Sequence, residues 1–339
     1  MAETKELKKA KDYATDQDVK WCPGCGDYSI LKQVQSVFAE LQVDTNDTVF
    51  ISGIGCSSRF PYYMNTYGMH SIHGRAPAFA AGLKSTNPEL DVWLITGDGD
   101  SLSIGGNHFI HLLRRNVDLN VLLFNNQIYG LTKGQYSPTS EKGKVTKSTP
   151  LGSVDHPFNP IALALGSDST FVARSMDRDP KHMRQMLLRA EQHKGTSLVE
   201  IYQNCNIFND GAFFPFTEKA TKSENTLFLE QGEPLIFGNG SDKGIILDGF
   251  NPKIVSLGEY SKSDLWVHDE TDRVKANILA RFFDDNSLEG ALPRPFGIFY
   301  TEERGNYEDE MNAQVAKFVE NKGPGNLNDL LRGPNTWSK

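Results

Sequence analysis

Two stretches of the sequence decide the fold class: VWLITGDGD at residues 92–100 and LNVLLFNN at residues 119–126. Each starts as a run of apolar residues, which is typical of a buried strand, and ends in polar residues or glycine. A helical pattern at residues 104–115 separates them. Because strands alternating with helices form parallel sheets, we expect Asp98 and Asn126 at the same edge of one sheet.

The alternation of strand and helix patterns continues on both sides of this unit. Helices are predicted at residues 27–41, 76–84, 161–165 and 180–193, and strands at 48–54, 171–173 and 197–202. We therefore predict an α/β fold: a parallel sheet with helices on both faces, within a domain at residues 21–205.

The two ends of the chain have a different character. Residues 1–20 are polar and charged, which predicts an N-terminal arm. Residues 206–306 are rich in Gly, Asn, Asp and aromatic residues, and residues 206–339 as a whole predict an irregular C-terminal extension, a cap or a partner-docking region. Short strands are expected there at 235–237, 244–247 and 253–256, and a helix at 310–319.

Composition excludes several classes of protein. The chain has 339 residues, 38% of them hydrophobic, and a net charge of −8, which argues against disorder and against nucleic-acid binding. Apolar runs such as residues 121–124 are too short to span a membrane, and no apolar signal core opens the chain. We expect a cytoplasmic protein. Four cysteines do not make a disulfide scaffold and favour metal or redox use.

The polar residues after the two strands fit a magnesium and diphosphate site. Asp98 offers a carboxylate, Asn126 an amide oxygen and Ile128 a backbone carbonyl, which are ligands that Mg²⁺ prefers. Gly97 and Gly99 allow close approach of a diphosphate. Either motif alone is more often a turn. Together, at neighbouring strand ends, they resemble the signature of thiamine diphosphate enzymes.

The four cysteines can form a second site. Cys22 and Cys25 form a CxxC pair before a helix, whereas Cys56 and Cys205 each follow a predicted strand. Four thiolates can hold a [4Fe–4S] cluster or a structural zinc ion. A redox dithiol at residues 22–25 and ordinary core roles for Cys56 and Cys205 are alternatives.

Five motifs together resemble one family. They are WCPGCG at residues 21–26, GIGCSSR at 53–59, HGRA at 73–76, GDGD at 97–100 and NNQIYGLTKGQYSPT at 125–139. Residues 18–210 are similar to the β subunits of 2-oxoacid:ferredoxin oxidoreductases, most of all to the 2-oxoglutarate branch.

The resemblance implies three cofactors: thiamine diphosphate, Mg²⁺ and one [4Fe–4S] cluster. Cys22, Cys25, Cys56 and Cys205 match the cluster ligands, and Asp98, Asn126 and the carbonyl of Ile128 match the Mg²⁺ ligands. The cofactor-binding positions that it implies are Ile54, Gly55, His73, Gly97, Asp98, Gly99, Asp100, Asn126, Ile128, Gly130 and Leu131. His73 would also face the reaction; a loop or core histidine is the alternative.

The resemblance also implies a reaction and partners. The enzyme would decarboxylate a 2-oxoacid oxidatively, transfer the acyl group to coenzyme A and pass electrons through the cluster to ferredoxin. An α subunit would supply the pyrimidine-side domain and the activating glutamate. The resemblance also implies that the active enzyme contains two αβ pairs.

Two cations bear on the choice of substrate. Arg59 and Lys133 lie in loops at the active edge, and the distal carboxylate of 2-oxoglutarate needs a cation, whereas pyruvate does not. Solvent exposure or pairing with the α subunit is the alternative role. Three competing functions are left open. They are an enzyme with pyruvate or broad 2-oxoacid specificity, a non-oxidative thiamine diphosphate lyase with structural zinc, and a non-catalytic scaffold.

Overall fold

A computed structural model describes residues 7–282, 292–335 and 337 of the chain. Predictions for residues 1–6, 283–291, 336 and 338–339 lie outside the described residues.

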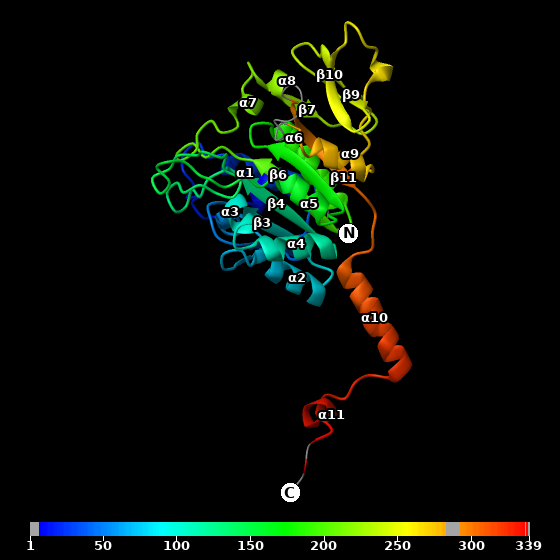
Figure 1. Ribbon diagram of the computed structural model, residues 1–339. Helices are drawn as coiled ribbons and strands as arrows, with labels where there is room; N and C mark the ends of the chain where they lie inside the picture. Colours follow the sequence, from blue (N-terminus) through cyan, green and yellow to red (C-terminus); the bar gives the residue numbers. More distant parts are fainter. Residues whose placement is uncertain (1–6, 283–291, 336, 338–339) are drawn as a thin grey trace.

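The main sheet has eight strands in the order β2-β1-β3-β4-β6-β5-β11-β7 (Figure 1). The strands are β1 (Thr48–Ser52), β2 (Tyr67–His70), β3 (Asp91–Gly97), β4 (Leu119–Asn125), β5 (Phe171–Met176), β6 (Thr196–Tyr202), β7 (Thr226–Phe228) and β11 (Arg294–Thr301). Among these strands only β11 and β5 pair antiparallel. The predicted parallel α/β sheet is confirmed.

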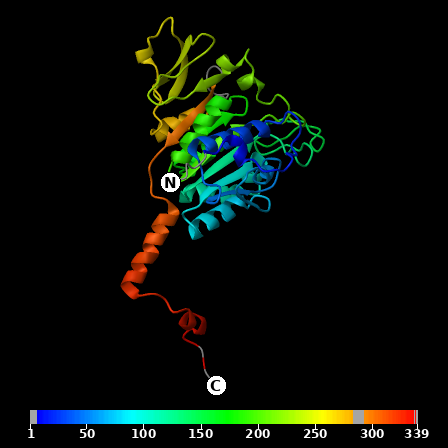
Figure 2. The ribbon, with the colours of Figure 1, turned by 180° about the vertical axis from the view of Figure 1, so that it is seen from behind.

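Helices cover both faces of this sheet, as Figures 1 and 2 show from opposite sides. One core cluster joins the sheet to α1 (Asp27–Leu41) and α6 (Pro180–Gln192). The other joins it to α2 (Ala76–Thr86), α4 (Gly106–Arg115), α5 (Pro160–Gly166) and α9 (Arg273–Leu279). Successive side chains of a strand point to opposite faces, so Leu122 and Phe124 belong to the first cluster and Val121 and Leu123 to the second.

The predicted helix at residues 104–115 is wrong in its start. The structure has two helices here: α3 (Asp98–Leu102), which begins inside the GDGD motif, and α4, which begins at Gly106. Gly97 is the N-cap of α3 in an extended conformation, with φ −95° and ψ 162°. The diphosphate motif is therefore the first turn of a helix rather than a free loop.

The main sheet extends beyond residue 205, where the sequence predicts an irregular extension. Strands β11 and β7 complete one side of it, and Leu227 and Phe299 share a core cluster with Leu94. A separate antiparallel sheet contains β8 (Ile236–Phe237), β9 (Lys243–Asp248) and β10 (Asn251–Ser256). The short helices α7 (Phe214–Thr217) and α8 (Lys222–Asn225) lie between β6 and β7, and η3 (Lys262–Asp264) follows β10. The division into domains at residue 205 stays a prediction.

The two ends of the described chain behave differently. The short helix η1 (Ala10–Tyr13) packs on α1, where the buried Tyr13 ring lies 5.7 Å from the Phe38 ring and its hydroxyl donates to the Val43 carbonyl at 3.0 Å. The predicted helix at 310–319 is α10 (Tyr307–Lys322), which extends away from the body with α11 (Leu327–Arg332), as Figures 1 and 2 show. No described helix is long and apolar enough to cross a membrane.

Candidate active site at the carboxyl edge of the sheet

All the residues predicted to bind the cofactor line one cavity of about 90 Å³. It lies where β1, β3 and β4 end. The residues are Ile54, Gly55, His73, Gly97, Asp98, Gly99, Asp100, Asn126, Ile128, Gly130 and Leu131; Asp27, Cys56 and Tyr129 line it as well. Parallel strands bring their carboxyl ends to one edge, which is why motifs distant in the sequence meet here.

Gly99 allows the tight packing of the diphosphate motif. A Cβ at this position would lie 2.2 Å from Cε1 of Tyr129, so a side chain cannot fit without movement. The Tyr129 hydroxyl donates to the Gly99 carbonyl at 3.0 Å. Tyr129 was not among the predicted site residues, although it lies inside the motif at residues 125–139. Through this hydrogen bond Tyr129 fixes the turn at Gly99, and the backbone at the start of α3 lines the cavity.

Asp98 is a buried carboxylate fixed by two hydroxyls. Its Oδ2 accepts hydrogen bonds from Ser137 Oγ at 2.6 Å and from Thr139 Oγ1 at 2.5 Å. Burial raises the pKa of Asp98 to about 6, and the two hydroxyls act against that rise. A cation beside the carboxylate would favour its ionised form. The buried position and the carboxylate orientation fixed through Oδ2 fit the Mg²⁺ ligand predicted here. Sequence analysis missed Ser137 and Thr139.

Asn126 is oriented by Gln203, the residue that follows β6. Its Nδ2 donates to Gln203 Oε1 at 2.8 Å, and its Oδ1 accepts from the Ile128 backbone N–H at 3.2 Å. The amide nitrogen is therefore held by Gln203, and the amide oxygen is the atom left to act as a ligand. Oxygen is the donor that Mg²⁺ requires.

Asp100 orders the loops around the cavity. Its Oδ1 lies 2.5 Å from His73 Nδ1 and accepts from the backbone N–H groups of Gly74 at 2.8 Å and Ile54 at 3.2 Å. Asp100 is buried, while the His73 side chain is 40% exposed at the cavity. Asp100 thus joins the loops after β1 and β2 to the start of α3.

A buried ion pair stands behind the site. Arg174 Nε donates to Glu200 Oε2 at 2.7 Å, and the side chains are 1% and 0% exposed. The other carboxylate oxygen of Glu200 accepts from Asn125 Nδ2 at 2.7 Å. Asn125 Oδ1 in turn lies 3.0 Å from Thr139 Oγ1. The pair thereby supports the end of β4 and the segment that holds Asp98.

The four cysteines gather beside the cavity as free thiols. A Cβ at Gly130 would lie 3.6 Å from both Cys56 Sγ and Cys205 Sγ. Burial is the main cause that raises the pKa of the Cys25 thiol, and the nearby Cys205 and Cys56 add to it. Burial likewise raises the pKa of Cys56 to about 12, with contributions from Asp27, Cys205 and Cys22.

Among the described residues, no three His, Cys, Asp or Glu side chains stand in the close arrangement that one metal ion needs. A cubane cluster holds its ligand sulfurs farther apart than one ion does and takes four thiolates. The chain has four cysteines, of which Cys56 and Cys205 lie together beside Gly130.

The two predicted substrate cations lie at different places. Arg59 lines a second cavity of about 570 Å³ that shares Ile54, Gly55 and Leu131 with the first. Leu131 is 50% exposed and is therefore not a core residue. Lys133, two residues further on, is exposed, with a left-handed backbone at φ 77°.

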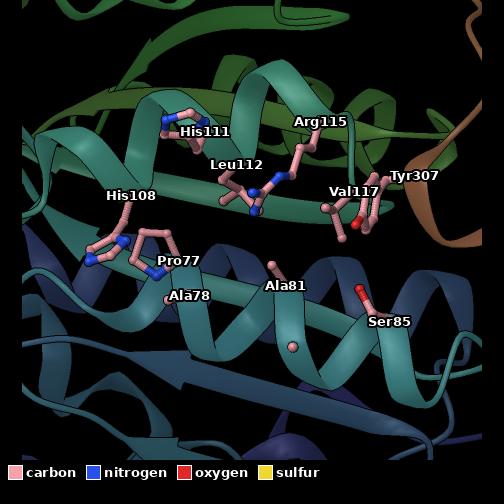
Figure 3. Close-up of a pocket in the computed structure, with 11 residues that line it drawn as sticks. Pro77, Ala78, Ala81, Ser85, His108, His111, Leu112, Arg115, Val117 and Tyr307 are labelled. Carbon is pink, nitrogen blue, oxygen red and sulfur yellow. The ribbon is translucent and has the colours of Figure 1, made fainter. Parts of the chain in front are cut away.

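Another hollow lies between α2 and α4 (Figure 3). Its volume is about 280 Å³, and small residues of α2, among them Ala78, Ala81 and Ser85, face His108, His111 and Arg115. It is lined by neither a carboxylate nor a cysteine. The predicted chemistry therefore concentrates at the carboxyl edge.

The parallel sheet, the GDG turn and the neighbouring Asn126 define the diphosphate-binding domain of a thiamine diphosphate enzyme. In agreement, the family described as "Thiamine pyrophosphate enzyme, C-terminal TPP binding domain" matches residues 53–201.

Known proteins make the assignment more specific. The chain is 49% identical to the 2-oxoglutarate oxidoreductase subunit KorB of Mycobacterium tuberculosis, over 99% of this chain and 90% of that one. It is 49% identical to the β subunit of 2-oxoacid:ferredoxin oxidoreductase 1 of Aeropyrum pernix, over 58% and 62% of the two chains. The structure of 2-oxoglutarate:ferredoxin oxidoreductase from Magnetococcus marinus, with 2-oxoglutarate, coenzyme A and succinyl-CoA bound, matches with a TM-score of 0.76 and 31% identity over 97% of each chain.

The chain belongs to the family of 2-oxoacid:ferredoxin oxidoreductase β subunits, in the 2-oxoglutarate branch. It is thus a subunit of an oxidoreductase. The family resemblance and the enzyme class predicted from the sequence are confirmed.

Proposed function

We propose that this chain holds thiamine diphosphate, Mg²⁺ and one [4Fe–4S] cluster at the carboxyl edge of its sheet. With its α subunit it oxidatively converts 2-oxoglutarate and coenzyme A to succinyl-CoA and CO₂. The electrons released by this oxidation pass to ferredoxin. The observation that carries this proposal is that Asp98, Asn126 and Cys56 line one cavity. The two cofactor sites are therefore adjacent.

The residues divide the work at this edge. When bound, thiamine diphosphate supplies an electron sink for decarboxylation. Asp98, the amide oxygen of Asn126 and the carbonyl of Ile128 hold Mg²⁺, while Gly97 and Gly99 admit the diphosphate. His73, oriented by Asp100, presents the rest of its ring to the reacting end of the cavity. The four cysteines hold the electron acceptor beside it.

Arg59 selects the substrate in this proposal. It stands in the cavity next to the cofactor site, where a guanidinium can bind the distal carboxylate of 2-oxoglutarate. Lys133, in the separate loop that follows β4, adds a second exposed positive charge at this edge of the sheet. We expect Arg59→Leu to raise the KM for 2-oxoglutarate about 10–100-fold, because a charge-assisted hydrogen bond is lost. Arg59→Lys keeps the charge and should lose less. An unchanged KM in Arg59→Leu would remove Arg59 from substrate binding.

The first experiment measures iron and acid-labile sulfide in the αβ complex, produced together and purified without oxygen. About four of each per β chain are expected for a [4Fe–4S] cluster. Absorption of the cluster should bleach on addition of 2-oxoglutarate and coenzyme A, and much less with pyruvate. Equal bleaching by pyruvate would indicate a broad 2-oxoacid range. Zinc in place of iron would replace this proposal by a non-oxidative lyase.

The cytoplasmic location and the assembly of two αβ pairs stay predictions. Gel filtration with light scattering of the purified complex tests the stoichiometry. A mass of a single αβ pair would contradict it.

A further inference from the structure

The side chain of Gln203 lies between the two groups of residues assigned above. It follows β6 directly and is 1% exposed. Its backbone N–H donates to the Asn125 carbonyl at 2.9 Å, which fixes the residue beside the end of β4. Gln203 is not among the residues that line the cavity. It reaches the site through two neighbours.

The polar atoms of this side chain are engaged in both directions. Gln203 Oε1 accepts from Asn126 Nδ2 at 2.8 Å. Gln203 Nε2 donates to Cys25 Sγ at 3.2 Å and to the Asn204 carbonyl at 2.8 Å. One amide therefore contacts a proposed Mg²⁺ ligand with its oxygen and a proposed cluster ligand with its nitrogen.

We infer that Gln203 is a positioning residue that couples the magnesium site to the cluster site. This inference rests on the proposed function, because it assigns Asn126 and Cys25 to the two cofactors. At one end Gln203 keeps the amide oxygen of Asn126 available to the metal. At the other end it donates a hydrogen bond to the cysteine sulfur.

The two ends predict two separate measurable effects. Partners that orient a metal ligand typically change metal affinity 10–100-fold when they are removed. A hydrogen bond to a ligand sulfur stabilises the more negative, reduced form of an iron–sulfur cluster, and thus raises its midpoint potential. Loss of Gln203 should therefore weaken Mg²⁺ binding and shift the potential to more negative values.

The test uses the anaerobically purified αβ complex. The midpoint potential is measured by a titration followed by electron paramagnetic resonance, and Mg²⁺ affinity by calorimetry with thiamine diphosphate at saturation. Gln203→Met, which has a similar size but neither polar atom, should show about 10-fold weaker Mg²⁺ binding. Its potential should be more negative than that of the wild-type complex.

Gln203→Glu separates the two ends. A carboxylate oxygen can still accept from Asn126 Nδ2, so Mg²⁺ affinity should return close to the wild-type value. The carboxylate cannot donate to Cys25 and adds negative charge, so the potential should stay low. If Gln203→Met does not assemble, the potential of Gln203→Glu still tests the sulfur contact, and a wild-type value would overturn the inference.

The matched control is Gln35→Met. Gln35 is also a buried glutamine, and its Nε2 donates to the Tyr63 carbonyl at 3.4 Å in the packing of α1. Gln35→Met should lower stability without changing the Mg²⁺ affinity or the midpoint potential. Equal changes in Gln35→Met, or a change at only one end in Gln203→Met, would overturn the coupling. A wild-type complex without iron or without Mg²⁺-dependent cofactor binding would instead refute the proposed function.

Discussion

Carboxyl groups with raised pKa values lie at both ends of the main sheet. At the carboxyl ends of the strands, burial raises the pKa of Asp27 to about 7 and that of Asp98 to about 6. At the amino ends, burial also raises the pKa of Asp91, the first residue of β3, and of Glu191 near the end of α6. If only the raised pKa values of their carboxyl groups are compared, the two ends of the sheet resemble each other.

Their surroundings differ. Asp27 and Asp98 line a cavity with glycine turns and a thiol, whereas Glu191 lies outside that cavity, is partly buried and accepts from Asn120 at 2.6 Å. Lys84, 6% exposed, lies 3.5 Å from Asp118 beside the amino ends. A raised carboxyl pKa therefore does not by itself mark a functional site, and the cavity with its accompanying ligands does.

The largest effect on stability is expected from the ion pair behind the site. Arg174→Met leaves Glu200 buried without this cation, so the complex should lose about 3–5 kcal/mol of stability. Replacing both residues by Met should restore most of it, since no unpaired charge is left. Lys84→Met at the other end should cost only about 1 kcal/mol, because Asp118 keeps a second cation, Lys194, at 3.5 Å. Denaturant unfolding of the complexes orders the variants, and equal losses would remove the difference between the ends.

Cofactor binding should separate the two ends most clearly. Asp98→Asn removes the proposed anionic ligand, and Mg²⁺-dependent binding of thiamine diphosphate should weaken at least about 100-fold. Asp118→Asn removes a carboxylate at the opposite end and should leave that affinity unchanged. Calorimetric titration measures both. A similar loss in the two variants would mean that the effect travels through general stability.

The glycine turn gives a smaller effect. Gly99→Ala places a methyl group 2.2 Å from Tyr129 Cε1, which should cost about 1–3 kcal/mol of stability and weaken the cofactor. Gly82→Ala in α2 is the matched control, because a Cβ at this position would have no neighbouring atom within 4 Å. It should stabilise the helix by about 0.5–1 kcal/mol. Thermal unfolding with and without cofactor compares them, and a tolerated Gly99→Ala would contradict the tight turn.

The smallest effect concerns pH at the amino ends. The pKa of Glu191 is raised above its ordinary value of 4.5, so the folded state binds more protons than the unfolded state. Stability from this group is present at low pH and is lost as the pH rises through the raised pKa. Glu191→Gln should flatten this decline of stability with pH. At pH values above the raised pKa, the variant should be more stable than the wild type by on the order of 1 kcal/mol. Unfolding midpoints measured across pH provide the check, with an unchanged slope as the contrary result.

The sequence predicted most of the central sheet because its signals are local. The apolar runs of β3, β4 and β6 are continuous. In the helices that alternate with the strands, apolar residues recur every three to four positions. The exposed four-residue strand β2 has no such signal, and β11 contains Pro295 and Gly297, which interrupt a strand pattern. Both were missed for that reason.

The sequence by itself determined the chemical inventory: four thiols, Asp98, Asn126 and the glycines that lie between strand and helix. Tertiary structure decided which side chains orient them. Ser137 and Thr139 reach Asp98 across 39 and 41 residues, and Gln203 reaches Cys25 across 178. Sequence spacing carries no information about such contacts, because a hydrogen bond forms only where the packed sheet brings donor and acceptor within about 3 Å of each other.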